Sequence, residues 1–181
     1  MKSSDPDAVR SSRKIILPGV GTFPAAMLWL RETGVADALR DAVAGGASLL
    51  GICVGHQLLF EDSDEMEWTA GLGLCTGKVR RFENALVAVP QIGWNRVSVA
   101  GGALFEGIPD GTPFYFVNSY RAVDVDDRDA IATASYGSPF VAAVGSGSVF
   151  GVQFHPEKSS DAGLRLLRNF VTATDRSVCP A

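Results

Sequence analysis

The chain has 181 residues, of which 46% are hydrophobic and 20% are charged, and its formal net charge is −4. Such a composition suits one compact domain, residues 1–181, that is large enough to bury a core of its own. The chain is mildly acidic and has no dense Lys/Arg stripe, so we do not expect a nucleic-acid-binding protein. It has no apolar run near the ~20 residues of a membrane span, so we do not expect a membrane-spanning protein.

The first half of the chain alternates strand and helix, which is the pattern of a parallel α/β sheet. Thr22 is the expected N-cap of a helix that has Pro24 in its first turn, and this helix is expected to break near Gly34. Two glycines, Gly45 and Gly46, stop it. In chain order, the expected segments are a polar surface stretch at 3–13, a strand at 14–17, this helix, and a buried strand at 49–52.

After Glu65 the pattern changes to short β-type segments separated by Gly, Pro, Asn and Asp. A last helix follows, and its spacing predicts one apolar face, formed by Leu164, Leu167, Phe170 and Val171. We expect an ordered core over about 14–174 and a frayed tail at 175–181. The predicted strands are 77–82, 85–89, 114–117, 121–125, 131–136, 140–144 and 148–153, and the last helix is predicted over 160–174.

The stretch 48–60 carries the first chemical motif. Its apolar run stops at Cys53, and Gly51 and Gly55 flank the cysteine two residues to either side. Gly-x-Cys-x-Gly is the thiol counterpart of the nucleophile elbow, in which a strand turns sharply into a helix; here Gln57–Phe60 would begin that amphipathic helix. Glycines tolerate the crowded turn, and the helix N-terminus favours a thiolate. On this motif alone, a buried structural cysteine is an equally good interpretation.

A second motif supplies a candidate base. The apolar segment 149–154 delivers His155, followed by Pro156, which cannot continue a central strand and so fixes the turn. Glu157 can accept a hydrogen bond from one imidazole nitrogen and leave the other facing a thiol. Because the carboxyl ends of parallel strands meet at one edge of a sheet, Cys53 and His155 could meet there. A histidine satisfied within a strand-end turn is the alternative for this motif alone.

Cysteine and histidine usage narrows the chemistry further. Cys53, Cys75 and Cys179 lie far apart without CxxC spacing, and the N-terminal segment lacks the apolar core of a secretory signal. We therefore expect reduced thiols in a cytoplasmic protein. With His56 and His155 as the two histidines, a zinc cluster is not expected. His56 is expected to serve packing or capping.

The chain resembles the class I (triad-type) glutamine amidotransferases in two motifs, G-I-C-V-G-H-Q and F-H-P-E. In that family cysteine, histidine and glutamate hydrolyse the side-chain amide of glutamine and release ammonia. The resemblance implies a flavodoxin-like, three-layer α/β fold with a mostly parallel central sheet and additional antiparallel strands. Within the family it is similar to the glutaminase subunits of imidazole glycerol phosphate synthase over residues 14–170, in L-P-G-V-G-T-F, G-L-G-L, V-P-Q-I-G-W-N, Y-F-V-N-S-Y-R and G-V-Q-F-H-P-E-K-S-S.

The resemblance implies a role for each matching residue. Cys53 would attack the carboxamide carbon, and His155, oriented by Glu157, would shuttle the proton. The backbone amide of Val54 would be one oxyanion donor. The second would be the amide of Val20, and the glycines on either side of it would allow that amide to flip inward. In the family, glutamine hydrolysis waits for the partner synthase, so this flip would be the switch.

Five positions match residues that hold the substrate glutamine in the family. Two of them, Ser119 and Tyr120, match residues that do so through the main chain. Glu65 has a second interpretation, as one more charge in an acidic loop. The five are Gly21, Gln57, Glu65, Ser119 and Tyr120.

The resemblance also implies a heterodimer with a cyclase/synthase subunit, and no cofactor or metal. Lys158 matches a residue that faces this partner, and Trp94 matches an aromatic at the ammonia exit, with a core or surface anchor as the alternative for Trp94. The implied activity hydrolyses glutamine to glutamate and passes the ammonia to a partner that makes imidazole glycerol phosphate and AICAR in histidine biosynthesis. The alternatives are a paralogous glutaminase that serves another synthase, such as one for sugar amination, a truncated chain without activity, and a general cysteine hydrolase.

The sequence departs from the family in two respects. The family usually opens with a strand, a helix and an Asp-Tyr-Gly-x-Gly-Asn-type motif before the segment that matches 3–13, and this sequence lacks that opening. We therefore expect an exposed sheet edge, with stability and partner docking affected more than the triad. In addition, Gln91 and Asn118 stand where histidine is common, which keeps a different synthase partner open.

Overall fold

The computed structural model describes residues 3–83 and 87–172. Its helices are α1 (Pro6–Arg10), α2 (Phe23–Glu32), α3 (Val35–Ala44), α4 (Val54–Gln57) and α5 (Ser160–Thr172), with 3-10 turns η1 (Ala103–Phe105) and η2 (Pro156–Lys158). Its strands are β1 (Lys14–Gly19), β2 (Ser48–Cys53), β3 (Asp62–Ser63), β4 (Thr69–Ala70), β5 (Lys78–Arg81), β6 (Gln91–Val99), β7 (Thr112–Asn118), β8 (Tyr120–Val123), β9 (Ala130–Tyr136), β10 (Ser138–Ser146) and β11 (Val149–Val152). None of the described helices is long and apolar enough to cross a membrane.

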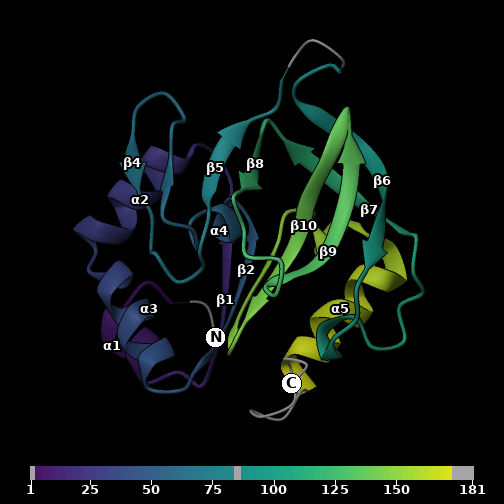
Figure 1. Ribbon diagram of the computed structural model, residues 1–181. Helices are drawn as coiled ribbons and strands as arrows, with labels where there is room; N and C mark the ends of the chain where they lie inside the picture. The colour runs from purple at the N-terminus through teal and green to yellow at the C-terminus, as the bar shows by residue number, and fades with distance from the viewer. Residues whose placement is uncertain (1–2, 84–86, 173–181) are drawn as a thin grey trace.

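The sheet has a parallel part built on β2. This strand lies between β1 and β11, runs parallel to both, and is buried along its whole length, as in a sheet covered on both faces. In Figure 1, α1, α2 and α3 lie together on one side of the sheet, and α5 lies on the other. The α/β class is therefore confirmed, and the carboxyl end of β2 opens onto the site described below.

The rest of the sheet is mostly antiparallel. From β11 it continues through β10, β8 and β5, while β9, β6 and β7 extend and curl it from β10 (Figure 1). Among described strands, parallel pairing is confined to β1–β2–β11 and β3–β5, so the sheet is mixed and its parallel part is smaller than expected. Short connections explain this: Ser146 pairs with Val149 across a two-residue turn, and a hairpin can only join antiparallel strands.

The sequence placed the first helical region correctly. It is broken between α2 and α3, where Gly34 has a φ of 73°, a left-handed conformation that glycine adopts without strain. The helix expected to begin at Gln57–Phe60 is different, because α4 ends at Gln57 and all residues from 54 to 60 are buried. The carbonyl oxygens of Leu58 and Phe60 accept backbone N–H groups from the following loop instead of continuing a helix.

The apolar face expected for the last helix needs correction. The buried residues of α5 are Gly163, Leu166 and Phe170, whereas Leu164 and Val171 are each 57% exposed. The apolar face is therefore rotated from the predicted one, because Gly163 lets the helix approach the backbone of η2, where a Cβ atom would overlap the Pro156 carbonyl. Leu167, also on the predicted face, is partly buried.

The region around the predicted strand 85–89 also differs. Residues 84–86 lie outside the described residues, and 87–89 form no strand. The strand is β6 instead, which the sequence analysis missed because its Gly93 and Asn95 resemble turn residues. The predicted frayed tail, 175–181, lies outside the described residues.

Candidate active site

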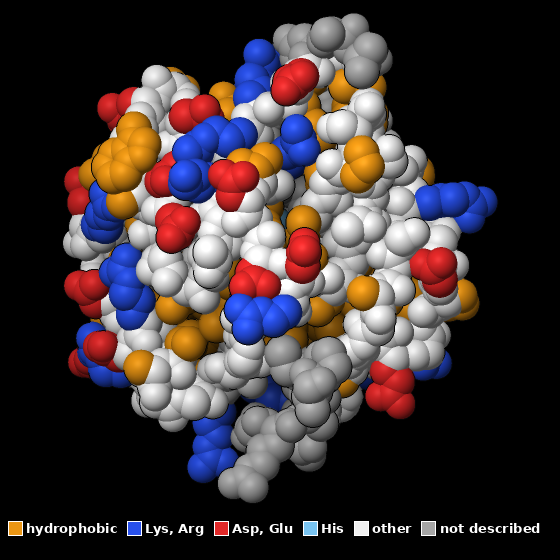
Figure 2. Space-filling model, viewed as in Figure 1, with side chains coloured by type: hydrophobic (Ala, Val, Ile, Leu, Met, Phe, Trp, Pro, Cys, Tyr) orange, Lys and Arg blue, Asp and Glu red, His pale blue; other side chains and the backbone are white. Residues whose placement is uncertain are grey.

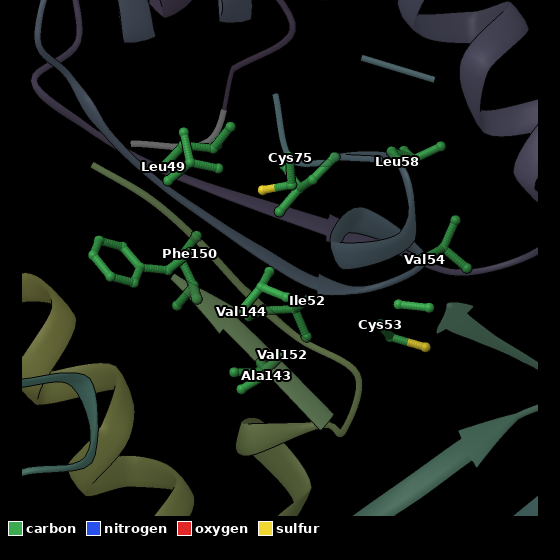
Figure 3. Close-up of a cluster of buried hydrophobic side chains, with 14 of the residues drawn as sticks. Leu49, Ile52, Cys53, Val54, Leu58, Cys75, Ala143, Val144, Phe150 and Val152 are labelled. Carbon is green, nitrogen blue, oxygen red and sulfur yellow. The ribbon is translucent and has the colours of Figure 1, made fainter. Parts of the chain in front are cut away.

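Cys53 occupies a strained elbow at the end of β2. Its φ of 55° and ψ of −111° are unusual for a residue with a side chain, and strain of this kind costs about 1–3 kcal/mol. Figure 3 shows Cys53 next to Val54, where β2 gives way to α4. The flanking glycines relieve crowding, not strain: a Cβ atom at Gly51 would lie 2.5 Å from the Gly55 carbonyl oxygen, and one at Gly55 would overlap the carbonyl of Leu17 on β1.

His155 is held in the turn that follows β11. Its Nδ1 lies 2.7 Å from Glu157 Oε1, as the motif predicted, so the imidazole is oriented by the carboxylate. The His155 backbone N–H donates to the Tyr115 carbonyl at 2.8 Å, which fixes the turn to β7. Ser159 completes this attachment, because its Oγ donates to the His155 carbonyl and accepts the Tyr115 N–H. No role for Ser159 is predicted from the sequence, although this residue lies in the H-P-E-K-S-S motif.

One cavity of about 380 Å³ brings the two motifs together. Of the twelve site residues predicted from the sequence, ten line this cavity, whereas Glu157, which contacts His155, and Trp94 do not. The predicted residues that line it are Val20, Gly21, Cys53, Val54, Gln57, Glu65, Ser119, Tyr120, His155 and Lys158, together with Pro90, Val117 and Asn118.

The surroundings of Cys53 favour the neutral thiol. Burial raises the pKa of Cys53 to about 11, while the Val54 backbone N–H and the Lys158 ammonium act to lower this pKa and the Glu157 carboxylate raises it. The sulfur atom lies 3.7 Å from the Val117 carbonyl oxygen, to which the thiol can donate. A reaction that needs the thiolate therefore needs a base in the same cavity, and His155 lines that cavity.

Glu65 is fixed by the start of α2. Its Oε2 accepts the N–H of Phe23 at 2.8 Å, where the helix dipole favours a negative charge. This contact distinguishes Glu65 from the other acidic residues of its loop and leaves Oε1 for other partners. The carboxylate is therefore a built part of the cavity wall.

Two side-chain amides donate to the Tyr120 carbonyl, and one of them also contacts the amide of Gln153. Gln57 Nε2 and Asn118 Nδ2 donate to this oxygen at 3.1 and 3.0 Å, and Gln57 Nε2 also lies 3.0 Å from Gln153 Oε1. Asn118 Oδ1 is buried and has no hydrogen-bond partner within residues 3–83 and 87–172. Asn118 lines the cavity, and Gln91 pairs with it across β6 and β7. Both are buried, so one of these two departures from the family lies at the cavity wall and the other lies beside it.

An aromatic surface borders the cavity on the Lys158 side. The Trp94 ring is 54% exposed and packs edge-on against Tyr115, with ring centroids 5.9 Å apart. Lys158 Nζ lies 6.0 Å from the centre of the same Tyr115 ring. Trp94 is therefore a surface aromatic one residue away from the cavity, not a part of its lining.

His56 follows Cys53 by three residues in the sequence, but it does not line the cavity. Its side chain is fully buried and packs edge-on against Phe60 with ring centroids 5.1 Å apart. In the part of the chain that the structure describes, neither ring nitrogen has a hydrogen-bond partner. Of the two expected roles of His56, packing is therefore the one that the structure shows. Gln153 is the polar residue whose position the sequence analysis overlooked; the available signal was a single amide inside the apolar run V-F-G-V-Q-F.

A sequence model described as "Glutamine amidotransferase class-I" matches residues 3–174. The chain belongs to this family. Solved structures share the fold of this chain. One described as a glutamine amidotransferase has a TM-score of 0.72 at 22% identity, with 94% of this chain and 85% of that chain covered. The acivicin-bound glutaminase domain of Trypanosoma brucei CTPS has a TM-score of 0.61 at 15% identity, with 97% and 78% covered.

Curated relatives resemble this class-I amidotransferase more closely in sequence. The "Imidazole glycerol phosphate synthase subunit HisH" of Moorella thermoacetica is 47% identical over 169 residues, which cover 93% of this chain and 80% of the relative. The protein of the same name from Herpetosiphon aurantiacus is 47% identical over 168 residues, with the same shares covered. The resemblance read from the motifs is therefore confirmed.

Proposed function

We propose that this glutamine amidotransferase hydrolyses glutamine to glutamate and ammonia as the glutaminase subunit of an imidazole glycerol phosphate synthase. The observation that carries the proposal is the meeting of a strained cysteine elbow with a Glu157-oriented His155 at one cavity. The name that both relatives carry, imidazole glycerol phosphate synthase subunit HisH, supports the assignment to this synthase.

The chemistry proceeds through a covalent thioester. His155 accepts the thiol proton, and the Cys53 sulfur attacks the carboxamide carbon of glutamine to give a tetrahedral oxyanion. This oxyanion collapses with loss of ammonia, which takes its proton from the imidazolium. A water molecule, deprotonated by the same imidazole, then attacks the thioester carbon and releases glutamate and the thiol. Glu157 stabilises the imidazolium throughout.

The Val54 amide is the first oxyanion donor, because it follows the nucleophile and already faces the sulfur atom. The second donor is the amide of Val20, which lines the cavity beside Gly21, a residue with a φ of 96°. Rotation of this peptide would complete the oxyanion hole, and loss of one such donor lowers the rate by roughly 10²–10³. Synthase binding would act through this rotation.

The α-amino group of glutamine is recognised by negative charge and amide oxygens. Glu65 offers its second carboxylate oxygen, and Gln57 offers Oε1, because its Nε2 is occupied by protein acceptors. The main chain of Ser119 and Tyr120 and the backbone at Gly21 contact the remaining polar groups of the substrate. Asn118 Oδ1, which has no partner among the described residues, can accept an N–H of the same substrate.

The synthase subunit docks on the surface formed by Trp94 and Lys158, next to the cavity, and so receives the ammonia in a heterodimer. The product is imidazole glycerol phosphate in histidine biosynthesis. A cytoplasmic location suits this function, because a reducing compartment keeps the Cys53 thiol free for catalysis.

The decisive experiment measures glutamate release from glutamine with and without the cyclase subunit of the synthase. We expect activity that depends on the cyclase subunit and that falls at least ~10³-fold in Cys53→Ala and His155→Asn. Cys75→Ala is the matched control, because Cys75 is a buried free thiol that does not line the cavity. Full activity in Cys53→Ala would show that the mechanism is wrong.

A further inference from the structure

Gln153 makes a contact with the nucleophile that the mechanism above does not use. It directly follows β11 and precedes His155 by two residues, and its side chain is fully buried. Gln153 Nε2 lies 3.9 Å from Cys53 Sγ, within the range of an N–H···S hydrogen bond. A buried amide is retained only where its polar atoms are satisfied, so the sulfur is one of the partners of this side chain.

The orientation of this amide follows from a backbone carbonyl. The Tyr120 oxygen can only accept, so the Gln57 atom that faces it at 3.1 Å must be the amide nitrogen. The same Gln57 nitrogen faces Gln153 at 3.0 Å, so Gln153 must present its oxygen to Gln57. Its NH₂ group is thereby directed toward Cys53. The polarity of the chain Tyr120–Gln57–Gln153–Cys53 is thus fixed without ambiguity between amide oxygen and nitrogen.

We propose that Gln153 is a positioning residue that stabilises and orients the Cys53 thiolate, a role that rests on the proposed function of Cys53 as nucleophile. In the neutral state the thiol donates to the Val117 carbonyl, and the Gln153 N–H meets a sulfur lone pair. When the proton leaves, the Val117 carbonyl dipole opposes the negative sulfur, whereas the N–H of Gln153 becomes a charge-assisted donor. The amide therefore favours the reactive form and holds it at one place in the cavity.

The test measures the thiol itself. Wild type, Gln153→Met, Gln153→Leu and Gln153→Glu are treated with iodoacetamide over a pH series, and modification of the peptide that contains Cys53 is followed by mass spectrometry. Loss of the donor in the Met and Leu variants should raise the apparent thiol pKa and slow alkylation about tenfold at a fixed pH below that pKa. The Glu variant should slow it further, because a second carboxylate then faces the thiolate.

A structural role alone predicts a different result. Asn169→Leu is the matched control: Asn169 donates its amide to the Leu104 and Glu106 carbonyls and does not line the cavity. It should lower the melting temperature and leave the pH profile of Cys53 alkylation at the wild-type position. Gln153→Met keeps the length of the side chain, so the test remains decisive even if the branched leucine prevents folding.

The two proposals can fail separately. If wild type hydrolyses glutamine and folded Gln153 variants keep its thiol pH profile, the role of Gln153 is wrong and the glutaminase proposal stands. If the profile shifts but wild type with the cyclase subunit releases no glutamate, the proposed function is wrong. Support for Gln153 also requires that kcat for glutamine falls in Gln153→Met with little change in KM, because the Tyr120 carbonyl still orients the Gln57 amide in the variant.

Discussion

Cys53 combines a strained backbone, which opposes stability, with a buried thiol, whose burial opposes its ionisation. The strain arises because the chain must turn at the apex of the elbow while α4 packs against β1 and β2 through Gly55 and Gly51. Burial raises the thiol pKa, so the reactive state exists only with the help of neighbouring groups. At this scale the site is arranged for reactivity and not for stability.

The strain predicts the order of two inactive variants. Cys53→Gly should be more stable to unfolding than Cys53→Ala by about 1 kcal/mol, because glycine adopts the φ of 55° without a Cβ clash. Urea unfolding monitored by circular dichroism measures the difference. An alanine variant as stable as the glycine variant would mean that the elbow stores no backbone strain.

His56 predicts a loss of stability in acid. Burial lowers its pKa from 6.5 to about 3, so between these values the unfolded chain binds a proton that the folded chain does not. Stability should therefore fall as the pH drops below 6.5, by up to about 1.4 kcal/mol per pH unit from this residue. Urea unfolding at pH 7.5 and pH 5 should show a difference about 2 kcal/mol smaller in His56→Leu than in wild type. Equal pH dependence in the two proteins would contradict the proposed burial of a neutral imidazole.

At the scale of single elements, α5 shows how close approach overrides periodicity. Hydrophobic spacing alone selects Leu164 and Val171, yet the helix is rotated so that Gly163 meets η2, which carries Glu157. Packing of the helix thereby supports the turn that holds the Glu157 carboxylate. A sequence pattern contains the apolar residues but not the partner that decides which of them are covered.

This rotation can be tested with two neighbouring leucines. Leu166 is 0% exposed and Leu164 is 57% exposed, so Leu166→Ala should lower the free energy of unfolding by about 2–5 kcal/mol. Leu164→Ala should change it by less than about 0.5 kcal/mol. Chemical denaturation of both variants gives the comparison, and equal losses would restore the face predicted from the sequence.

At the scale of the whole molecule, two exposed apolar regions differ in their connection to the cavity. Acidic and basic side chains are intermixed over the face shown in Figure 2, and hydrophobic side chains emerge between them, including the region of α2 and β4 where Leu28, Met66 and Trp68 are exposed. The surface at Trp94 differs from that region because it continues through Tyr115 and Lys158 into the cavity.

Trp94 is therefore the residue expected to anchor the synthase subunit. Trp94→Ala should weaken binding of the cyclase subunit at least tenfold, about 1.4 kcal/mol, because buried aromatic anchors carry much of the energy of an interface. Isothermal titration calorimetry measures the affinity. Trp29→Ala is the control, since Trp29 is 48% exposed on α2 and does not line the cavity. Equal effects of the two variants would place the interface elsewhere.

The sequence by itself determined the α/β class, the family, the elbow at Cys53 and the His155–Glu157 pair. These features are local: they depend on a few consecutive residues whose strand, turn and glycine pattern allow few conformations. The break at Gly34 belongs to the same group, because a left-handed residue there ends one helix and begins the next.

Only the tertiary structure decided the features that join distant segments. The end of α4, the buried face of α5 and the strand β6 were missed or misplaced, because each depends on backbone partners far away in the chain. The same holds for Gln153. Its amide acquires a direction only when the Tyr120 carbonyl, 33 residues earlier in the chain, orients Gln57, and no spacing within one strand can encode that contact.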